Sequence, residues 1–243
     1  MTAATVQIFE ARTQDADYFR PTLTAAEQRR AARYRVAADR DRFVVSAGLL
    51  RQAAGTDVGR WCQRCAQLGD HGQPVPLDEA GMPVAGTALS ATHSAGTVLV
   101  AVSRDAPVGI DVEALAMTRA WSDADREAFD RIALSRPERA ALAPLSPANA
   151  DRSRLQCWVR KEAALKATGL GLAVAPSELE FAETTLVGWP AALDPFFSSG
   201  VTVTDRALST TGVIAALAVL STDECVIVHE PATYPARVLP AAS

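Results

Sequence analysis

Four side chains in two short stretches have the types and spacing expected of a site that binds a metal ion and a charged ligand. In Val108–Glu113, strand periodicity places Asp111 and Glu113 on one face, ~7 Å apart at the backbone from a rise of ~3.3 Å per residue. Two such carboxylates can converge on a hard divalent cation, and an all-oxygen pair favours Mg²⁺. Glu162 and Lys166 are four residues apart and project from one helix face.

Each pair also has a purely structural interpretation. Glu162 and Lys166 could form a surface ion pair, and the strand carboxylates could line a solvated edge. Composition favours function, because Lys161 and Lys166 are the only lysines in a chain that otherwise uses arginine. A chain with this habit needs an ammonium at these positions, so we expect this helix to have a functional role. Gly109, on the carboxylate face of the strand, leaves room for something to approach.

The elements that must position these residues follow from periodicity and capping signals. Leu155–Thr168 lacks Pro and Gly and stops at Gly169, which predicts a helix. Thr24, with Glu27 three residues later, predicts a capped helix start. Further helices are expected over Ala38–Ala53, over Ser122–Leu134 and from Ser135, and strands over Thr5–Glu10, Thr97–Ser103, Glu178–Glu183, Val201–Asp205, Val213–Leu220 and Cys225–His229. Loops are expected at Pro144–Asn149 and Val75–Ala85, and a loosely ordered tail at Pro231–Ser243.

Helices followed by strands appear in each half, which predicts an α+β fold of two lobes. The two lobes would be residues 1–116 and 117–243, joined near Leu115–Trp121. A site in the cleft between them would combine the strand carboxylates of the first lobe with the helical pair of the second.

Three further features could bind ligands. His93 lies in a polar stretch between two strands rather than on an apolar stripe, which favours a ligand contact. The arginine-rich helices of the first third should bring at least one arginine to a phosphate. Cys62, Cys65 and His71 resemble half of a zinc knuckle, but the other half is missing, so a structural zinc is not expected.

Composition excludes several classes of protein. The chain has 243 residues and a formal net charge of -4, which argues against a general nucleic-acid binder. We expect no membrane span, no signal peptide and, with four cysteines, no disulfide framework, so the expected location is the cytoplasm.

Taken together, these motifs resemble the 4'-phosphopantetheinyl transferases of the large monomeric Sfp-like type. The strong matches are 109–113 (Gly-Ile-Asp-Val-Glu), 158–166 (Trp-Val-Arg-Lys-Glu-Ala-Ala-Leu-Lys) and the 92–94 turn (Thr-His-Ser). Weaker matches are Arg42-Phe43 and 71–74 (His-Gly-Gln-Pro), and the resemblance runs in order over nearly the whole chain. It implies a monomeric pseudo-dimer of two similar α+β lobes with coenzyme A in the cleft. Such an enzyme moves phosphopantetheine onto a serine of an acyl or peptidyl carrier protein and releases adenosine 3',5'-bisphosphate.

The resemblance also implies roles for individual residues. Asp111, Glu113 and Glu162 match the magnesium ligands, and Glu162 also matches the general base. Lys166 matches the lysine at the pyrophosphate, and His93 the contact to the 3'-phosphate of coenzyme A.

Other cofactor contacts are implied by weaker correspondences. Thr92 matches a neighbour of the phosphate contact, and Arg30, Arg42 and Lys161 fall near basic contacts to the cofactor. Gln73 stands where the family usually has Lys or Arg beside the adenine, which implies a contact of Gln73 with the cofactor there.

Two other functions remain open on the sequence alone. The chain could be another Mg²⁺-dependent phosphotransferase or pyrophosphatase that uses a nucleotide. It could also be a non-catalytic module that binds coenzyme A or a carrier protein, although intact Glu162 and Lys166 argue against that.

Overall fold

The computed structural model describes residues 4–221 and 225–231. All but the first residue of the tail expected at Pro231–Ser243 lies outside the described residues. None of the helices in the described ranges has the length and apolar character to cross a membrane.

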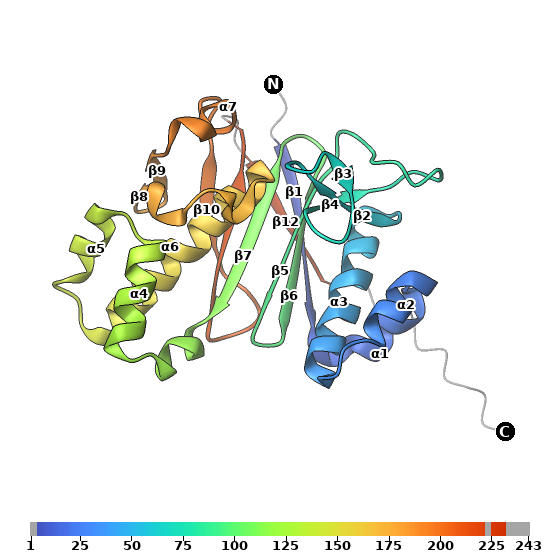
Figure 1. Cartoon of the computed structure of the whole chain (residues 1–243), viewed down its shortest axis with the longest axis horizontal. Coiled ribbons are helices and arrows are strands. Elements are labelled where there is room, and N and C mark those ends of the chain that lie inside the picture. Colours follow the sequence, from blue (N-terminus) through green and yellow to red (C-terminus); the bar gives the residue numbers. More distant parts are fainter. Residues whose placement is uncertain (1–3, 222–224, 232–243) are drawn as a thin grey trace.

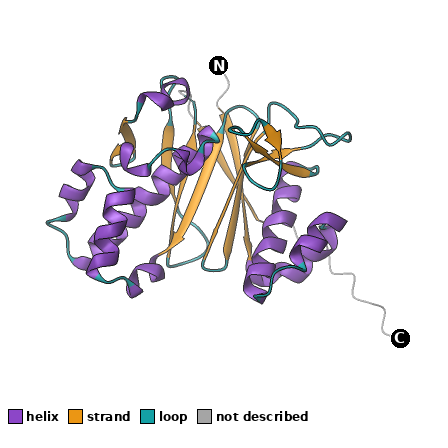
Figure 2. Cartoon of the chain, viewed as in Figure 1, coloured by secondary structure: helices purple, strands orange, loops and turns teal. Residues whose placement is uncertain are grey.

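Two larger sheets form the centre of the molecule (Figures 1 and 2). The first has the strand order β12-β1-β6-β5, and in it β1 pairs in parallel with β12 and antiparallel with β6. The second has the order β10-β11-β7 and is antiparallel. Their strands are β1 (Ala4–Arg12), β5 (Ala88–Ser94), β6 (Thr97–Ser103), β7 (Val108–Ala114), β10 (Thr202–Arg206), β11 (Val213–Val219) and β12 (Cys225–Pro231).

One long helix covers the outer face of each larger sheet. α3 (Ala37–Ala54) packs on the first sheet and α6 (Pro147–Thr168) on the second. Figure 1 shows the helices in two groups, α1–α3 on one side of the strands and α4–α6 on the other. The remaining α-helices are α1 (Ala16–Phe19), α2 (Ala25–Ala31), α4 (Asp123–Ala133), α5 (Arg136–Leu142) and α7 (Asp194–Phe197).

Alternation along the strands divides the core into layers. In β6, Val98, Val100 and Val102 pack against α3, while Leu99 and Ala101 belong to an apolar cluster with the second sheet. Every one of these five side chains is at most 5% exposed. The layers are therefore helix, sheet, sheet and helix, as period-two burial predicts for strands enclosed on both faces.

Two small sheets lie outside these layers. The sheet β3-β2-β4 contains β2 (Val58–Cys62), β3 (Gln67–Leu68) and β4 (Gln73–Pro76), and the second is a hairpin of β8 (Glu180–Ala182) and β9 (Thr185–Gly188). Short 3₁₀ helices connect the elements at Thr13–Asp15, Arg20–Thr22, Leu115–Ala120, Gly171–Ala173, Pro176–Glu178 and Ala191–Leu193.

The α+β class is confirmed, and most expected elements are present. The loop expected at Pro144–Asn149 is wrong, because α6 begins at Pro147 with Ser146 as its N-cap. Proline at the first helical position costs little, since its missing N–H would have no partner there.

The domain boundary between residues 116 and 117 stays a prediction. Strands from its two sides pair with each other in both larger sheets. β7 pairs with β11 from the second part of the chain, and β12 pairs with β1 from the first. Each larger sheet therefore includes a strand from the other side of that boundary.

Candidate active site

The approach of α6 to β7 depends on Gly109. A Cβ atom at this position would lie 1.9 Å from the Ala163 carbonyl oxygen and 2.5 Å from the Ala167 nitrogen. The room that the sequence indicated at Gly109 is therefore filled by the backbone of α6, and not by a ligand. This close contact sets α6 directly over the strand that carries Asp111 and Glu113.

The two acidic residues of β7 lie on its α6 face, as predicted, while the alternate residues Val108, Ile110 and Val112 are fully buried between the sheets. Asp111 is buried and receives a hydrogen bond from Lys166 Nζ, with 2.6 Å between Nζ and Asp111 Oδ1.

Hydroxyl groups join the edge of one large sheet to the edge of the other. β5 and β7 belong to different sheets, and the Ser90, Thr92 and Ser94 side chains of β5 bridge them. Their oxygens accept hydrogen bonds from the backbone N–H groups of β7, at 3.1 Å from Ile110 N, 3.4 Å from Val112 N and 3.0 Å from Ala114 N. Alternate hydroxyls on β5 thus satisfy buried donors that would otherwise be costly.

Two of these hydroxyls also hold the carboxylates. Thr92 Oγ1 donates to Asp111 Oδ1 at 2.9 Å, and Ser94 Oγ donates to Glu113 Oε2 at 3.0 Å. Thr92 was expected to contact the cofactor, but its hydroxyl is already engaged as a donor and as an acceptor. We therefore assign it a positioning role.

Glu162 and Lys166 lie on the face of α6 that meets this strand. Glu162 is 7% exposed, and burial raises its pKa from 4.5 to about 7. The positive charge of Lys166 opposes this rise in pKa, and the negative charges of Asp111 and Glu113 add to it. Burial, and then Asp111, also raise the pKa of Glu113. A carboxyl that titrates near neutrality is suited to general base catalysis.

These groups face a cavity of about 490 Å³. Its acidic and lysine side chains are Asp39, Asp111, Glu113, Glu162 and Lys166, and its other polar and aromatic ones are Arg30, Arg42, Arg60, Tyr34, Ser46, Thr92, His93, Phe43 and Trp158. The pairing of strand carboxylates with the α6 residues at one site, predicted from the sequence, is therefore found in the structure.

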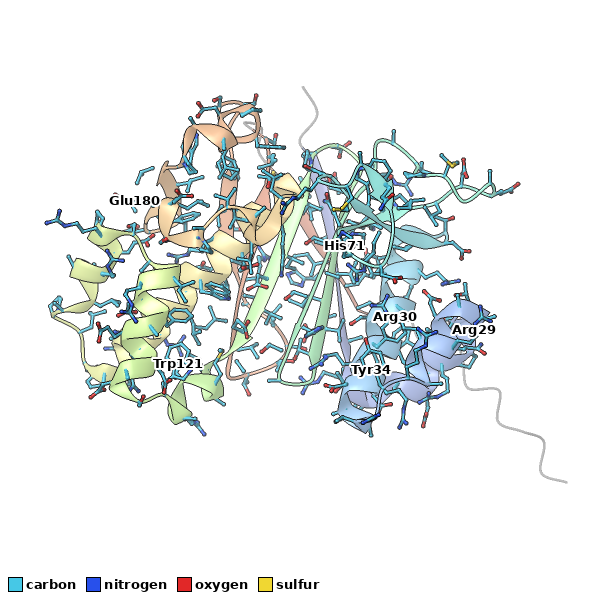
Figure 3. All side chains as sticks on the ribbon, viewed as in Figure 1. Arg29, Arg30, Tyr34, His71, Trp121 and Glu180 are labelled. Atoms are coloured by element: carbon cyan, nitrogen blue, oxygen red, sulfur yellow. The ribbon has the colours of Figure 1, made fainter. Side chains whose placement is uncertain are left out.

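Arginines supply positive charge at the cavity wall opposite α6. Arg42 pairs with Asp39 at 2.6 Å, and the Arg30 guanidinium lies 5.2 Å from the centre of the Phe43 ring. Figure 3 shows Arg30 and Tyr34 on the side of the molecule formed by α1–α3. Sequence reasoning missed Tyr34 and Arg60, a residue of β2 whose pKa is lowered by burial and by Arg30. No local pattern marked β2 as part of the site.

His93 lines the cavity from within β5, where it pairs with Val98, and not from a turn as expected. The hairpin turn comes two residues later, at Ala95 and Gly96. Partial burial of the ring, together with the positive charge of Arg42, lowers the pKa of His93. A neutral imidazole in the resting protein can gain a proton when an anion arrives.

Lys161 is not at the site, so its expected contact with the cofactor is wrong. It is 0% exposed, and its Nζ donates to the Ala133 carbonyl at 2.8 Å and to Glu138 Oε2. A compact ammonium suits this buried pair, which gives a structural reason for one of the two lysines.

Gln73 also does not line the cavity. Its Nε2 donates to the Leu89 carbonyl at 3.5 Å, and its Oε1 lies against Gly169 at the end of α6. The predicted adenine contact at this position therefore has no support from the geometry.

The side chains of this site fit a hard cation by their chemistry. Among the residues that the structure describes, Asp111 Oδ2 and Glu162 Oε1 are buried oxygens without a hydrogen-bond partner. Such orphaned carboxylate oxygens are costly and are satisfied by a cation. Within the described ranges, however, Asp111, Glu113 and Glu162 do not form a group whose ligand atoms all lie within 4.8 Å of one another. The oxygen donors therefore fit Mg²⁺ by their chemistry, but the three carboxylates are not close enough together to coordinate one ion in this arrangement.

Comparisons with known proteins bear on the same segment. Residues 107–201 match the family model of the 4'-phosphopantetheinyl transferase superfamily. No curated protein sequence matches the chain. A holo-(acyl-carrier-protein) synthase from Bacillus anthracis str. Ames, solved in complex with CoA (3',5'-ADP), is similar at 19% identity and a TM-score of 0.39, over 47% of this chain and 95% of that one.

The matched segment contains all four residues first singled out by their chemistry, Asp111, Glu113, Glu162 and Lys166. The prediction of a transferase is confirmed by this match. Residues 107–201 thus carry the signature of the 4'-phosphopantetheinyl transferase superfamily.

Proposed function

We propose that this chain transfers the 4'-phosphopantetheine group of coenzyme A to a serine hydroxyl of an acyl or peptidyl carrier protein. The observation that carries the proposal is that two pairs of charged side chains line the same cavity. Glu162 and Lys166 on α6 meet Asp111 and Glu113 on β7, inside the segment that matches the superfamily.

Glu162 is proposed as the general base. Burial raises its pKa to about 7, which makes it a stronger base than an exposed carboxylate, and it can accept the proton of the incoming serine. The serine oxygen then bonds to the phosphorus that carries pantetheine. The bond from that phosphorus to the bridging oxygen breaks, and adenosine 3',5'-bisphosphate leaves with the bonding electrons.

Lys166 is proposed to stabilise this leaving group or to give it a proton. Its Nζ contacts Asp111 Oδ1 and the Ile110 carbonyl, and because an ammonium has three N–H donors it can also donate to a phosphate oxygen when coenzyme A binds. Lys166 is half-buried, which strengthens its attraction for an anion relative to an ammonium in bulk water.

Asp111, Glu113 and Glu162 are the residues that would hold Mg²⁺. When bound, the ion would neutralise charge on the pyrophosphate oxygens as a Lewis acid. The chain's own part is to keep the carboxylates in place, through the Thr92 and Ser94 hydroxyls.

The adenosine end of coenzyme A is proposed to lie along the arginine side of the cavity. Arg30, Arg42 and Arg60 can contact its phosphates, with His93 at the 3'-phosphate. On this proposal the enzyme is a monomer of the large Sfp-like type, organised as two lobes at residues 1–116 and 117–243, and acts on carrier proteins in the cytoplasm.

The nucleotide products separate this proposal from the two alternatives. Coenzyme A and Mg²⁺ are incubated with and without an apo-carrier protein, and the nucleotides are resolved by chromatography. We expect adenosine 3',5'-bisphosphate only when the carrier is present. Release without the carrier would instead indicate a pyrophosphatase, and unchanged coenzyme A with a carrier that a known transferase modifies would indicate a binding module.

A further inference from the structure

A second cluster of ligating side chains lies outside the catalytic cavity, on the small sheet β3-β2-β4. Cys62 ends β2, Cys65 lies in the turn that follows, and His71 precedes β4. One ligand atom from each residue lies within 4.8 Å of the other two. Figure 3 labels His71 near the middle of the view, above Arg30 and Tyr34.

We propose that Cys62, Cys65 and His71 bind one zinc ion, with the fourth position open to solvent or to an added ligand. The distance between Cys65 Sγ and His71 Nε2 is 3.4 Å. A tetrahedral zinc with bonds of about 2.3 Å to sulfur and about 2.0 Å to nitrogen sets these atoms roughly 3.5 Å apart. Two sulfurs and an imidazole also favour zinc over the hard cation expected in the cavity.

The local backbone brings the three ligands together before any metal binds. The Cys65 N–H donates to Cys62 Sγ at 3.4 Å, an outer contact that stabilises a thiolate. Gly72 has a φ of 103°, and a Cβ there would lie 2.2 Å from the Trp61 carbonyl oxygen. Only glycine permits this contact, which returns the chain so that His71 meets the cysteine pair.

A structural metal would compensate for the poor burial of this sheet. No residue of β2 or β3, both within the described ranges, is buried, and in β4 only Pro74 and Pro76 are, so a small sheet of this kind gains little from the hydrophobic effect. A zinc ion that joins the end of β2 to the start of β4 would supply the missing stabilisation.

The same sheet contacts the catalytic half of the protein. Gln63, between the two cysteines, donates from Nε2 to the Thr168 carbonyl at the end of α6 at 2.9 Å, and Arg60 lines the catalytic cavity. The zinc would therefore be a positioning device, which fixes two contacts to the site without touching the reacting atoms. The zinc proposal does not depend on the proposed reaction.

The test uses the full chain, without an affinity tag, purified without chelator or added metal. Elemental analysis is expected to find about one zinc per chain. After zinc is removed with a chelator, Co²⁺ should produce the absorption of a tetrahedral thiolate complex, and Zn²⁺ should raise the melting temperature. Cys65→Ser and His71→Ala should each weaken Zn²⁺ binding by at least about tenfold.

Cys157→Ser is the matched control, because Cys157 is half-buried on α6 and lies neither in the group of Cys62, Cys65 and His71 nor in the lining of the catalytic cavity. It should bind Zn²⁺ as the wild type does. If Cys65→Ser folds poorly, the cobalt spectrum and the zinc-dependent melting of wild-type protein still decide the question. Zinc content unaffected by Cys65→Ser, a wild-type protein without the cobalt spectrum, or a Cys62–Cys65 disulfide in protein isolated without air would overturn the proposal.

Discussion

At the residue scale, Lys166 and Lys161 show how one residue type serves two purposes on the same helix. Lys166 is half-buried and lines the cavity, whereas Lys161 is enclosed with Glu138. Both positions favour a compact ammonium over a guanidinium, but only Lys166 belongs to the proposed catalytic site. Composition indicated that these lysines are special without telling the two reasons apart.

We expect Lys166→Arg to retain coenzyme A binding but to lower kcat on the order of 10²-fold, the scale of a lost general acid. Nζ now fits between Asp111 Oδ1 at 2.6 Å and the Ile110 carbonyl at 3.4 Å, where a planar guanidinium is too large. Calorimetry measures binding, and steady-state rates measure kcat. Lys166→Met, which lacks the charge, should lose both. Near wild-type kcat in Lys166→Arg would show that charge alone matters.

Glu162 should make the protein less stable as the pH rises. Its folded pKa of about 7 exceeds the ordinary 4.5, so the folded state holds this proton more tightly than the unfolded state. The free energy of unfolding therefore falls between about pH 4.5 and pH 7, by at most about 3 kcal/mol at roughly 1.4 kcal/mol per pKa unit. In Glu162→Gln this loss disappears, so the variant should be more stable than wild type at pH 8, by about 1–2 kcal/mol after the desolvation of the amide.

Urea denaturation at several pH values, in the presence of a chelator, measures this difference. Glu127→Gln is the control, because its side chain is 75% exposed on α4. The same pH dependence of stability in Glu162→Gln and wild type would contradict the assignment of a buried, raised carboxyl.

At the scale of elements, the site depends on how α6 meets β7. We expect Gly109→Ala to destabilise the protein by about 1–3 kcal/mol and to reduce activity, because the new Cβ overlaps the backbone of α6 at Ala163 and Ala167. Gly69→Ala is the matched control, since a Cβ there meets nothing within 4 Å. Thermal melts and rates compare the two variants, and equal stability in both would show that the helix is not held by this contact.

The hydroxyl bridge between β5 and β7 makes a second prediction at this scale. Thr92→Val keeps the shape but removes the acceptor for Val112 N–H and the donor to Asp111. We expect a loss of about 1–3 kcal/mol, together with a lower kcat, because Asp111 is no longer held. Thr92→Ser keeps the hydroxyl and should stay close to wild type in both measurements. A Thr92→Val protein with wild-type stability and kcat would remove the bridge from the account.

At the scale of the whole molecule, local signals predicted elements well and contacts between distant segments poorly. Thr24 and Ser122 predict their helix starts because each forms a capping box within three residues. The alternation in β7 likewise predicts that Asp111 and Glu113 share one face, because it depends only on neighbouring residues. The contact of Gly109 with α6, and the parallel pairing of β1 with β12, join segments far apart in the chain, so no local pattern predicts them.

If the site formed by β7 and α6 catalyses phosphopantetheine transfer, the mass of the carrier protein must increase by that group. An apo-carrier is incubated with coenzyme A, Mg²⁺ and either wild type, Glu162→Gln or Glu127→Gln, and intact-mass spectrometry follows the carrier over time. We predict the addition of one phosphopantetheine group with wild type and Glu127→Gln, at equal rates, and a rate at least about 10²-fold lower with Glu162→Gln. An unchanged carrier with wild type, or equal rates with all three proteins, would contradict the account.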